Sequence, residues 1–257
     1  MKELILSDCI LIGFVNYGES DRIVKLFSRE RGLISAIAKR VRSHKHKWAG
    51  LLEIGQTLEV KLSPPKNDLW LLISVQEVQS TATIRKDLLK LSTMQYCCEV
   101  TGVLSIPEDP NPKLHGLLAH TIKTLNELPT PGSAAFNGFA VKALAISGHH
   151  PQLKTCTFCG EEIGASRLFH TSLGSIVHEH CVESHPETLQ THLFFTPNNW
   201  ALDVHNLLHQ PMISYWESTL SVLRNNKRSS TWLLTEMIEH TVERGIRSRS
   251  VLQTLYP

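Results

Sequence analysis

The sequence predicts an α+β chain in which a small five-stranded barrel precedes a mainly α-helical domain. Residues 4–76 contain short runs of Ile, Leu and Val that turn residues separate, and after Ser80 the hydrophobic period becomes helical. A motif of paired Cys and His residues then interrupts the helical part. We therefore expect a barrel domain over residues 1–80 and a helical domain over residues 81–257, with an inserted ribbon at about 154–184.

Five segments of the first domain have the composition of strands: Cys9–Val15, Arg22–Phe27, Leu33–Ala38, Thr57–Leu62 and Leu69–Val75. An open sheet of this size would leave unpaired edges, so a closed or nearly closed barrel of the OB-fold type is expected. Several aromatic residues alternate with aliphatic ones in these strands and are expected to pack in the core, with added surface for base stacking as the alternative: Phe14, Tyr17, Phe27 and Trp70.

The helical part begins with apolar residues at spacings near three and four: Ile84, Leu88, Leu91, Met94, Cys98 and Val103. Thr81 or Thr83 is a candidate N-cap of this first helix. Further helices are predicted at Lys113–Leu128, Ala134–Ser147, Asn198–Leu208, Ile213–Asn225 and Thr231–Leu255. Between Cys156 and Cys181, glycines and the strand-like runs Arg167–His170 and Ser175–Val177 indicate a β-ribbon.

The ribbon carries the pattern C-x2-C-x18-H-x2-C, formed by Cys156, Cys159, His178 and Cys181. Each knuckle directs two ligands toward one point, as tetrahedral Zn²⁺ requires. Four protein ligands leave no position for water, so a structural zinc ion is expected, with no catalytic residue. His180 is the rival fourth ligand, although its place next to Cys181 makes a shared tetrahedral shell harder to reach.

The motif is open to two other interpretations. In the first, the motif consists of ordinary buried thiols and a surface histidine. Cys9, Cys97 and Cys98, which lie in apolar runs, are expected to be buried thiols of this kind. An enzymatic site on His178-Glu179-His180 fails on residue order, because a zinc protease needs H-E-x-x-H and a deaminase places H-x-E before P-C-x-x-C. A zinc-dependent nucleic-acid hydrolase or deaminase therefore remains only as an alternative hypothesis.

A basic segment lies between the third and fourth predicted strands, although the net charge of the chain is only +2. Cations release counterions from phosphates, and an aromatic face can stack on an unpaired base. The expected DNA-binding residues are Lys39, Arg40, Arg42, Lys45, Lys47 and Trp48. A merely solvated loop is the alternative for such a charge run. Arg244, Arg247 and Arg249 form a second basic set, either a further contact or ordinary charges near a helix end.

Two stretches carry a resemblance to a known family: the run Tyr17-Gly18-Glu19-Ser20-Asp21-Arg22-Ile23-Val24 and the ending Gly245-Ile246-Arg247-Ser248-Arg249-Ser250-Val251-Leu252. With Gly32-Leu33, Ala38-Lys39 and the CxxC ribbon, the chain resembles the RecO family of bacterial recombination mediators over nearly its whole length. His178 departs from the third Cys that metal-binding members usually have at this position.

The resemblance implies binding of single- and double-stranded DNA, annealing of complementary strands and no enzymatic activity. It implies RecR and the C-terminal tail of single-stranded DNA-binding protein as partners, with a link to RecA loading and a further candidate link to RecF. An RNA-binding factor with the same two modules is the other alternative. No apolar run is long enough to span a bilayer and no signal peptide is evident, so we expect a cytoplasmic, nucleoid-associated protein without membrane contact.

Overall fold

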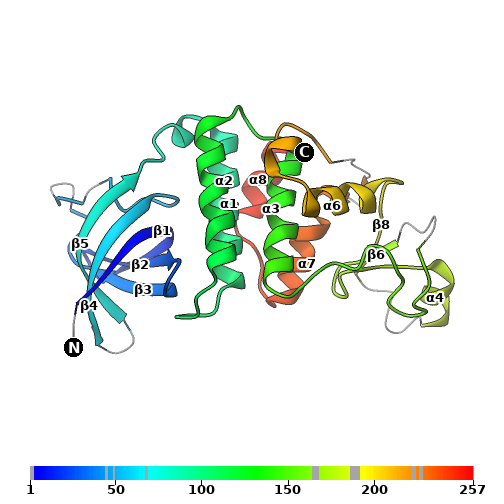
Figure 1. The fold of residues 1–257 in the computed structure, drawn as a ribbon, viewed down its shortest axis with the longest axis horizontal. Coiled ribbons are helices and arrows are strands. Elements are labelled where there is room, and N and C mark those ends of the chain that lie inside the picture. The colour runs from blue at the N-terminus through cyan, green and yellow to red at the C-terminus, as the bar shows by residue number, and fades with distance from the viewer. Residues whose placement is uncertain are drawn as a thin grey trace. The chain divides into compact units, whose positions relative to one another are not determined.

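A computed structural model of the chain describes residues 3–43, 46–48, 50–66, 69–163, 168–185, 192–220, 224–225 and 228–256. The chain divides into two compact units, Met1–Leu128 and Pro129–Pro257. Figure 1 labels the helices and strands of both units. None of the described helices combines the length and the apolar character that crossing a bilayer requires.

The first unit begins with a closed five-stranded barrel, which confirms the predicted fold class. Its strands are β1 (Leu4–Tyr17), β2 (Asp21–Ser28), β3 (Gly32–Ala38), β4 (Thr57–Lys66) and β5 (Leu69–Gln79). They follow the order β1-β2-β3-β5-β4, and β4 pairs with β1 to close the ring. The β3–β5 contact is parallel, with Ala36 opposite Trp70 and Ile37 opposite Leu71.

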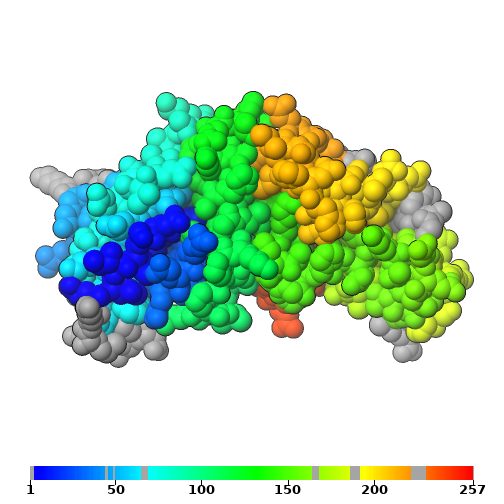
Figure 2. All heavy atoms as spheres, viewed as in Figure 1, coloured from blue at the N-terminus to red at the C-terminus, as the bar shows by residue number. Residues whose placement is uncertain are grey.

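Alternating residues of the strands fill the barrel, because successive side chains of a strand point to opposite faces. Val24 and Leu26 of β2 are fully buried in the core, whereas Lys25 between them is exposed. Leu58, Val60 and Leu62 of β4 follow the same rule. In Figure 2, side chains of β1, in dark blue, lie at the surface of the barrel between lighter blue and cyan strands.

Two helices complete the first unit, α1 (Leu88–Leu104) and α2 (Pro112–Glu127), and they run side by side in Figure 1. The N-cap of α1 is Asp87, whose carboxylate accepts from the backbone N–H groups of Leu89 and Lys90. The prediction of Thr81 or Thr83 as the cap was therefore wrong, because Ile84–Lys86 forms a separate 3-10 turn, η1. The predicted domain boundary at residue 80 coincides with the end of β5 and stays a prediction.

The barrel and these helices are joined by polar contacts. The His115 ring donates from Nε2 to the carbonyl of Asp8 at 2.8 Å, and Trp70 donates from Nε1 to the Glu108 carboxylate at 3.1 Å. Since buried or half-buried polar groups need partners, these bonds fix the sites at which α2 and the α1–α2 connection meet the barrel.

The second unit is built around α3 (Ser133–Ile146), most of whose residues are buried. It packs against α6 (Trp200–His209) and α7 (Leu233–Thr241), and α8 (Arg249–Leu255) follows α7. The Lys142 ammonium on α3 donates to the carbonyls of Leu207, Leu208 and Gln210, which satisfies the carbonyl end of α6. The helices predicted at 113–128, 134–147 and 198–208 are thus confirmed as α2, α3 and α6.

Two helix predictions in this unit were wrong. The described residues between 213 and 225 do not form a helix, because Met212–Tyr215 is only a 3-10 turn, η2, and Arg224–Asn225 forms strand β9, which pairs with β10 (Arg228–Ser229). Residues 231–255 do not form one helix. The turn η3 (Ser230–Trp232) precedes α7, and α7 ends at Thr241 because Glu239 accepts from the Ile246 backbone N–H and turns the chain before α8.

The ribbon interrupts the helices as predicted. Strand β6 (Leu168–His170) pairs with β7 (Ser175–Val177), and the short helix α4 (Glu179–Ser184) follows. A further strand, β8 (Leu193–Phe195), adds to the other side of β6. The segment before the CxxC turn runs beside β7, because Gln152 forms a parallel bridge with Ser175, and this brings the chain after Val177 close to that turn.

Candidate functional site

Four side chains of the ribbon converge on one point. Ligand atoms of Cys156, Cys159, His178 and Cys181 all lie within 4.8 Å of one another. The first two come from a turn in which Gly160, at φ +74°, donates to the Cys156 carbonyl at 2.9 Å. The other two come from the start of α4, where Cys181 donates its backbone N–H to the His178 carbonyl. Such a cluster could hold a metal ion.

The ring of His178 is oriented for ligation through Nδ1. Its Nε2 lies 3.2 Å from the carbonyl of Glu162, which can only accept, so Nε2 carries the proton. Nδ1 then holds the lone pair, and it lies 3.3 Å from the Cys159 sulfur. A carbonyl partner on the far nitrogen is the usual support of a metal-ligating histidine. His180 stands outside the cluster and stacks on His178 with ring centroids 5.0 Å apart.

The thiols of the cluster differ in their acidity. Burial opposes ionisation of Cys156, but backbone N–H groups of Cys159, His178 and Phe158 outweigh it and lower the pKa of the thiol to about 6. Burial, followed by the neighbouring Cys156 and Cys159, raises the pKa of Cys181 to about 12. A bound cation would offset the influence of Cys156 and Cys159 and favour loss of the Cys181 proton.

The remaining cysteines are buried, as expected from their apolar runs. Burial raises the pKa of Cys9 and of Cys98 to about 12, and it raises the pKa of Cys97 as well. These three thiols are core side chains and take no part in the cluster.

The basic segment leaves the barrel after β3, and its described residues form turns. Lys39, Arg40, Arg42 and Lys47 are all exposed, and Lys45 lies outside the described residues. No ion pair within the described residues involves these four cations. Their charges are therefore available to an anionic ligand.

Hydrogen bonds attach this segment to the β1–β2 turn. The Arg42 guanidinium donates from Nη1 to the carbonyls of Gly18 and Glu19, at 3.2 and 3.0 Å. The Arg42 backbone N–H donates to the Ser20 carbonyl at 3.0 Å, and that of Arg40 donates to the Asp21 carboxylate at 2.7 Å. Arg40 itself has a left-handed backbone, at φ +58°.

The position of Trp48 revises the sequence-based expectation. Its indole is only 7% exposed and belongs to the barrel core, as does Val41. The ring therefore anchors the basic segment and offers no face to a base. Phe27 and Trp70 are buried as expected, but Tyr17 is not in the core, because its side chain is 53% exposed. The exposure of Tyr17 agrees with the alternative of a surface for base stacking.

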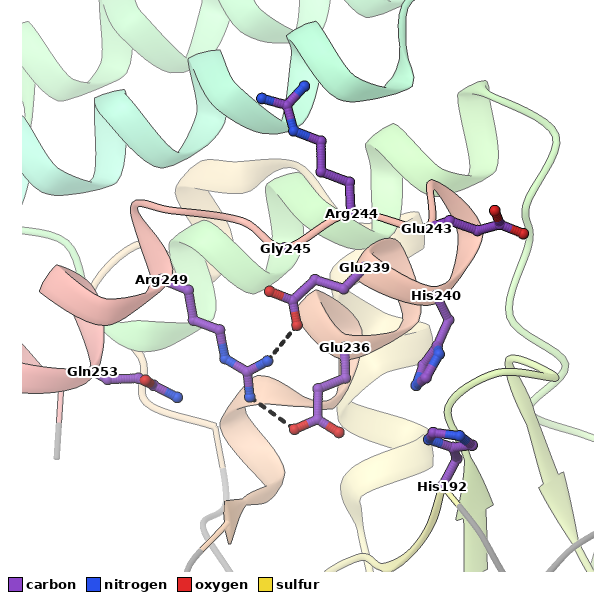
Figure 3. A pocket seen from close by; sticks show the side chains of 9 residues that line it. All are labelled: His192, Glu236, Glu239, His240, Glu243, Arg244, Gly245, Arg249 and Gln253. Atoms are coloured by element: carbon purple, nitrogen blue, oxygen red, sulfur yellow. Dashed lines mark hydrogen bonds and ion pairs between the residues drawn. The ribbon is translucent and has the colours of Figure 1, made fainter.

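The C-terminal arginines have different environments, and Figure 3 shows two of them beside a polar pocket of about 750 Å³. Arg249 points to Glu236 and Glu239, with Nη2 2.7 Å and Nη1 2.5 Å from their carboxylate oxygens. Its side chain is 16% exposed and that of Glu236 is 7% exposed. Arg249 therefore stabilises the α7–α8 turn. Arg244 points away from this ion pair.

Comparison with known proteins finds two family matches that together span most of the chain. Residues 1–81 match the family described as Recombination protein O N terminal, and residues 85–250 match Recombination protein O C terminal. A protein of Anaeromyxobacter dehalogenans (strain 2CP-C) named DNA repair protein RecO is 31% identical over 182 residues, which cover 70% of this chain and 71% of that protein. A relative of the same name in Myxococcus xanthus (strain DK1622) is 30% identical over 68% of this chain and 71% of its own length. Another, in Synechococcus sp. (strain JA-3-3Ab), is 27% identical over 93% of this chain and 81% of its own length.

Metal binding at the cluster should strengthen as the pH rises. The Cys181 thiol is neutral near pH 7 because its pKa is raised, and a metal ligand must be a thiolate, so binding releases at least one proton. We expect the apparent Zn²⁺ affinity to rise about tenfold or more per pH unit between about pH 7 and 8. Competition with a chromophoric chelator measures this slope, and a pH-independent affinity would contradict it.

Replacing Arg249 should destabilise the second unit. Arg249→Ala leaves the buried Glu236 carboxylate without its guanidinium, and breaking a buried ion pair on one side costs about 3 kcal/mol. Urea denaturation measures the change in the free energy of unfolding. The matched control is Arg244→Ala, which removes an exposed guanidinium from the same pocket wall and should change stability by less than about 0.5 kcal/mol.

Proposed function

The chain belongs to the RecO family of DNA repair and recombination proteins, and on this premise we propose that it binds single- and double-stranded DNA and anneals complementary strands. With RecR, it helps to load RecA onto DNA coated with single-stranded DNA-binding protein. It works without catalysis, in the cytoplasm at the nucleoid, and it docks on the C-terminal tail of single-stranded DNA-binding protein. RecF is a further candidate partner.

The observation that carries the DNA-binding proposal is the exposed basic segment on the barrel. Lys39, Arg40, Arg42 and Lys47 lie within a short stretch that Trp48 and Val41 anchor in the core. Anchoring lowers the entropy lost on binding, and the cations neutralise phosphates whatever the base sequence. Lys45 belongs to the proposed set as well. OB-folds commonly bind oligonucleotides on one face and its loops, which agrees with this location.

We propose that the Cys/His cluster holds a structural Zn²⁺. Three thiols and one imidazole are the donors that zinc prefers, and when bound the ion would cross-link the CxxC turn to the start of α4. All four positions of a tetrahedral shell are then taken by side chains. This donor set supports a structural role over the alternative of a zinc-dependent hydrolase or deaminase.

Removal of three cations should weaken DNA binding and reduce its salt dependence. For the variant Lys39→Ala, Arg40→Ala, Lys47→Ala, we expect the slope of log affinity against log salt for a single strand to become shallower by about 2. Fluorescence anisotropy measures the slope, and the same variant should anneal complementary strands coated with single-stranded DNA-binding protein more slowly.

The matched control removes three exposed lysines elsewhere in this unit, Lys86, Lys113 and Lys123. An equal loss in both variants would remove the basic segment from the site, and stronger binding to RNA than to DNA of the same length would favour an RNA-binding factor.

Loss of the first knuckle should abolish metal binding and lower stability together. Cys156→Ser, Cys159→Ser removes two of the four ligands, so a structural ion can no longer be held. Atomic emission gives the metal content per chain and thermal unfolding gives the stability. A variant that stays as stable as the wild type while losing a hydrolytic or deaminase reaction would support the catalytic alternative instead.

A further inference from the structure

We propose that Tyr17 is the side chain on which an unpaired base stacks, and that Arg42 acts as a positioning residue that holds Tyr17 beside the basic segment. This inference rests on the proposed function, since it assigns residues within the same DNA-binding site. Tyr17, which the sequence offers only as an alternative stacking surface, takes this role in place of Trp48, which is buried.

Tyr17 is the exposed aromatic side chain among those that the structure describes in the barrel. Phe27, Trp48 and Trp70 are buried, and Phe14 is half-buried with the Arg22 guanidinium 4.1 Å from its ring centroid. Tyr17 is the last residue of β1 and pairs with Asp21 across the hairpin. The Tyr17 ring is 53% exposed, and a base stacked on it would remove apolar ring surface from water.

Arg42 connects this ring to the cations. Its Nη1 donates to the carbonyls of Gly18 and Glu19, the two residues that follow Tyr17. Asp21, opposite Tyr17 in the hairpin, accepts from the Arg40 backbone N–H. The turn that carries the ring and the segment that carries the charges therefore form one hydrogen-bonded structure, in which the position of Tyr17 depends on Arg42.

The surface next to Tyr17 is also suited to bases. Val15 lies on the same face of β1 as Tyr17, because the two are separated by one residue, and Val15 is 53% exposed. The ladder places Val15 opposite Ile23, and Ile23 opposite Ile37, so an apolar row crosses β1, β2 and β3. Lys25, next along the same face of β2, is exposed. Bases over this row would have phosphates within reach of cations on both sides.

Affinity for two labelled strands of about 20 nucleotides tests the role of Tyr17. One strand is oligo(dT), and the other has the same backbone with abasic sites throughout, so only the first can stack. We expect Tyr17→Ala to weaken oligo(dT) binding about tenfold while leaving the abasic strand and the salt slope unchanged. Tyr17→Phe should bind both strands as the wild type does. Ile5→Ala, at another exposed apolar position of β1, is the matched control.

A double-mutant cycle tests the role of Arg42. If Arg42 acts on bases through Tyr17, Tyr17→Ala should lose most of its effect in an Arg42→Ala background. In a Lys47→Ala background the effect of Tyr17→Ala should be retained in full, since the hydrogen bonds to the hairpin that carries Tyr17 come from Arg40 and Arg42. A simple loss of charge at Arg42 would leave the two substitutions independent.

The outcomes separate this inference from the function on which it rests. Wild-type binding that is salt-dependent, with Tyr17→Ala unchanged on oligo(dT) or weakened equally on both strands, would overturn the stacking role and keep the proposed function. Additive effects of Tyr17→Ala and Arg42→Ala would overturn the positioning role. No salt-dependent binding by the wild type would overturn both. Thermal unfolding of the Tyr17 variants is expected to match the wild type because Tyr17 is exposed, and the same measurement on Arg42→Ala shows that this variant is folded.

Discussion

Closure of the barrel by the parallel contact of β3 with β5 is the constraint on which the rest of the first unit depends. Because β5 occupies the place beside β3, the chain cannot turn directly from β3 into β4 and must cross the barrel end between Ala38 and Thr57. The crossing segment contains the basic residues. Val41 and Trp48 pack into the core from it, and the cations between and beside them remain in solvent. The strand order therefore places the basic segment on the barrel surface, where Val41 and Trp48 anchor it in the core.

In the second unit, the three-stranded sheet of β6, β7 and β8 gains little stability from strand pairing alone. The strands β6, β7 and β8 have three residues each, and so few ladder bonds give little stability in water. The Cys/His cluster lies where the CxxC turn meets the start of α4, so an ion there would join segments that are distant in sequence. The same unit uses Arg249 in an equivalent way, since one guanidinium joins two carboxylates of α7 to the start of α8.

The errors of the sequence-based predictions share one cause. Contacts with residues outside a periodic segment compete with the structure that its local pattern favours, and the pattern carries no information about those contacts. The pattern over 231–255 is compatible with one helix, but the Glu239 carboxylate takes the Ile246 N–H and ends α7. Thr81 and Thr83 are good caps by type, yet Asp87 caps α1 because a 3-10 turn intervenes. Trp48 is buried and Tyr17 is exposed, against the favoured expectation for each, since a residue in a loop can enter a core and a residue at a strand end can leave it.

By itself the sequence indicated the barrel, most of the helices, and all four members of the Cys/His cluster. Period-two and near-3.6 patterns report burial within one element, and the ligands of a knuckle are three residues apart, so these features depend on short stretches of chain. Only the tertiary structure decided that Arg249 is structural, that Nδ1 of His178 faces the thiols, and that Tyr17 rather than Trp48 is exposed beside the cations. Those outcomes depend on which distant groups meet, and contacts between distant segments are set by packing of the whole unit.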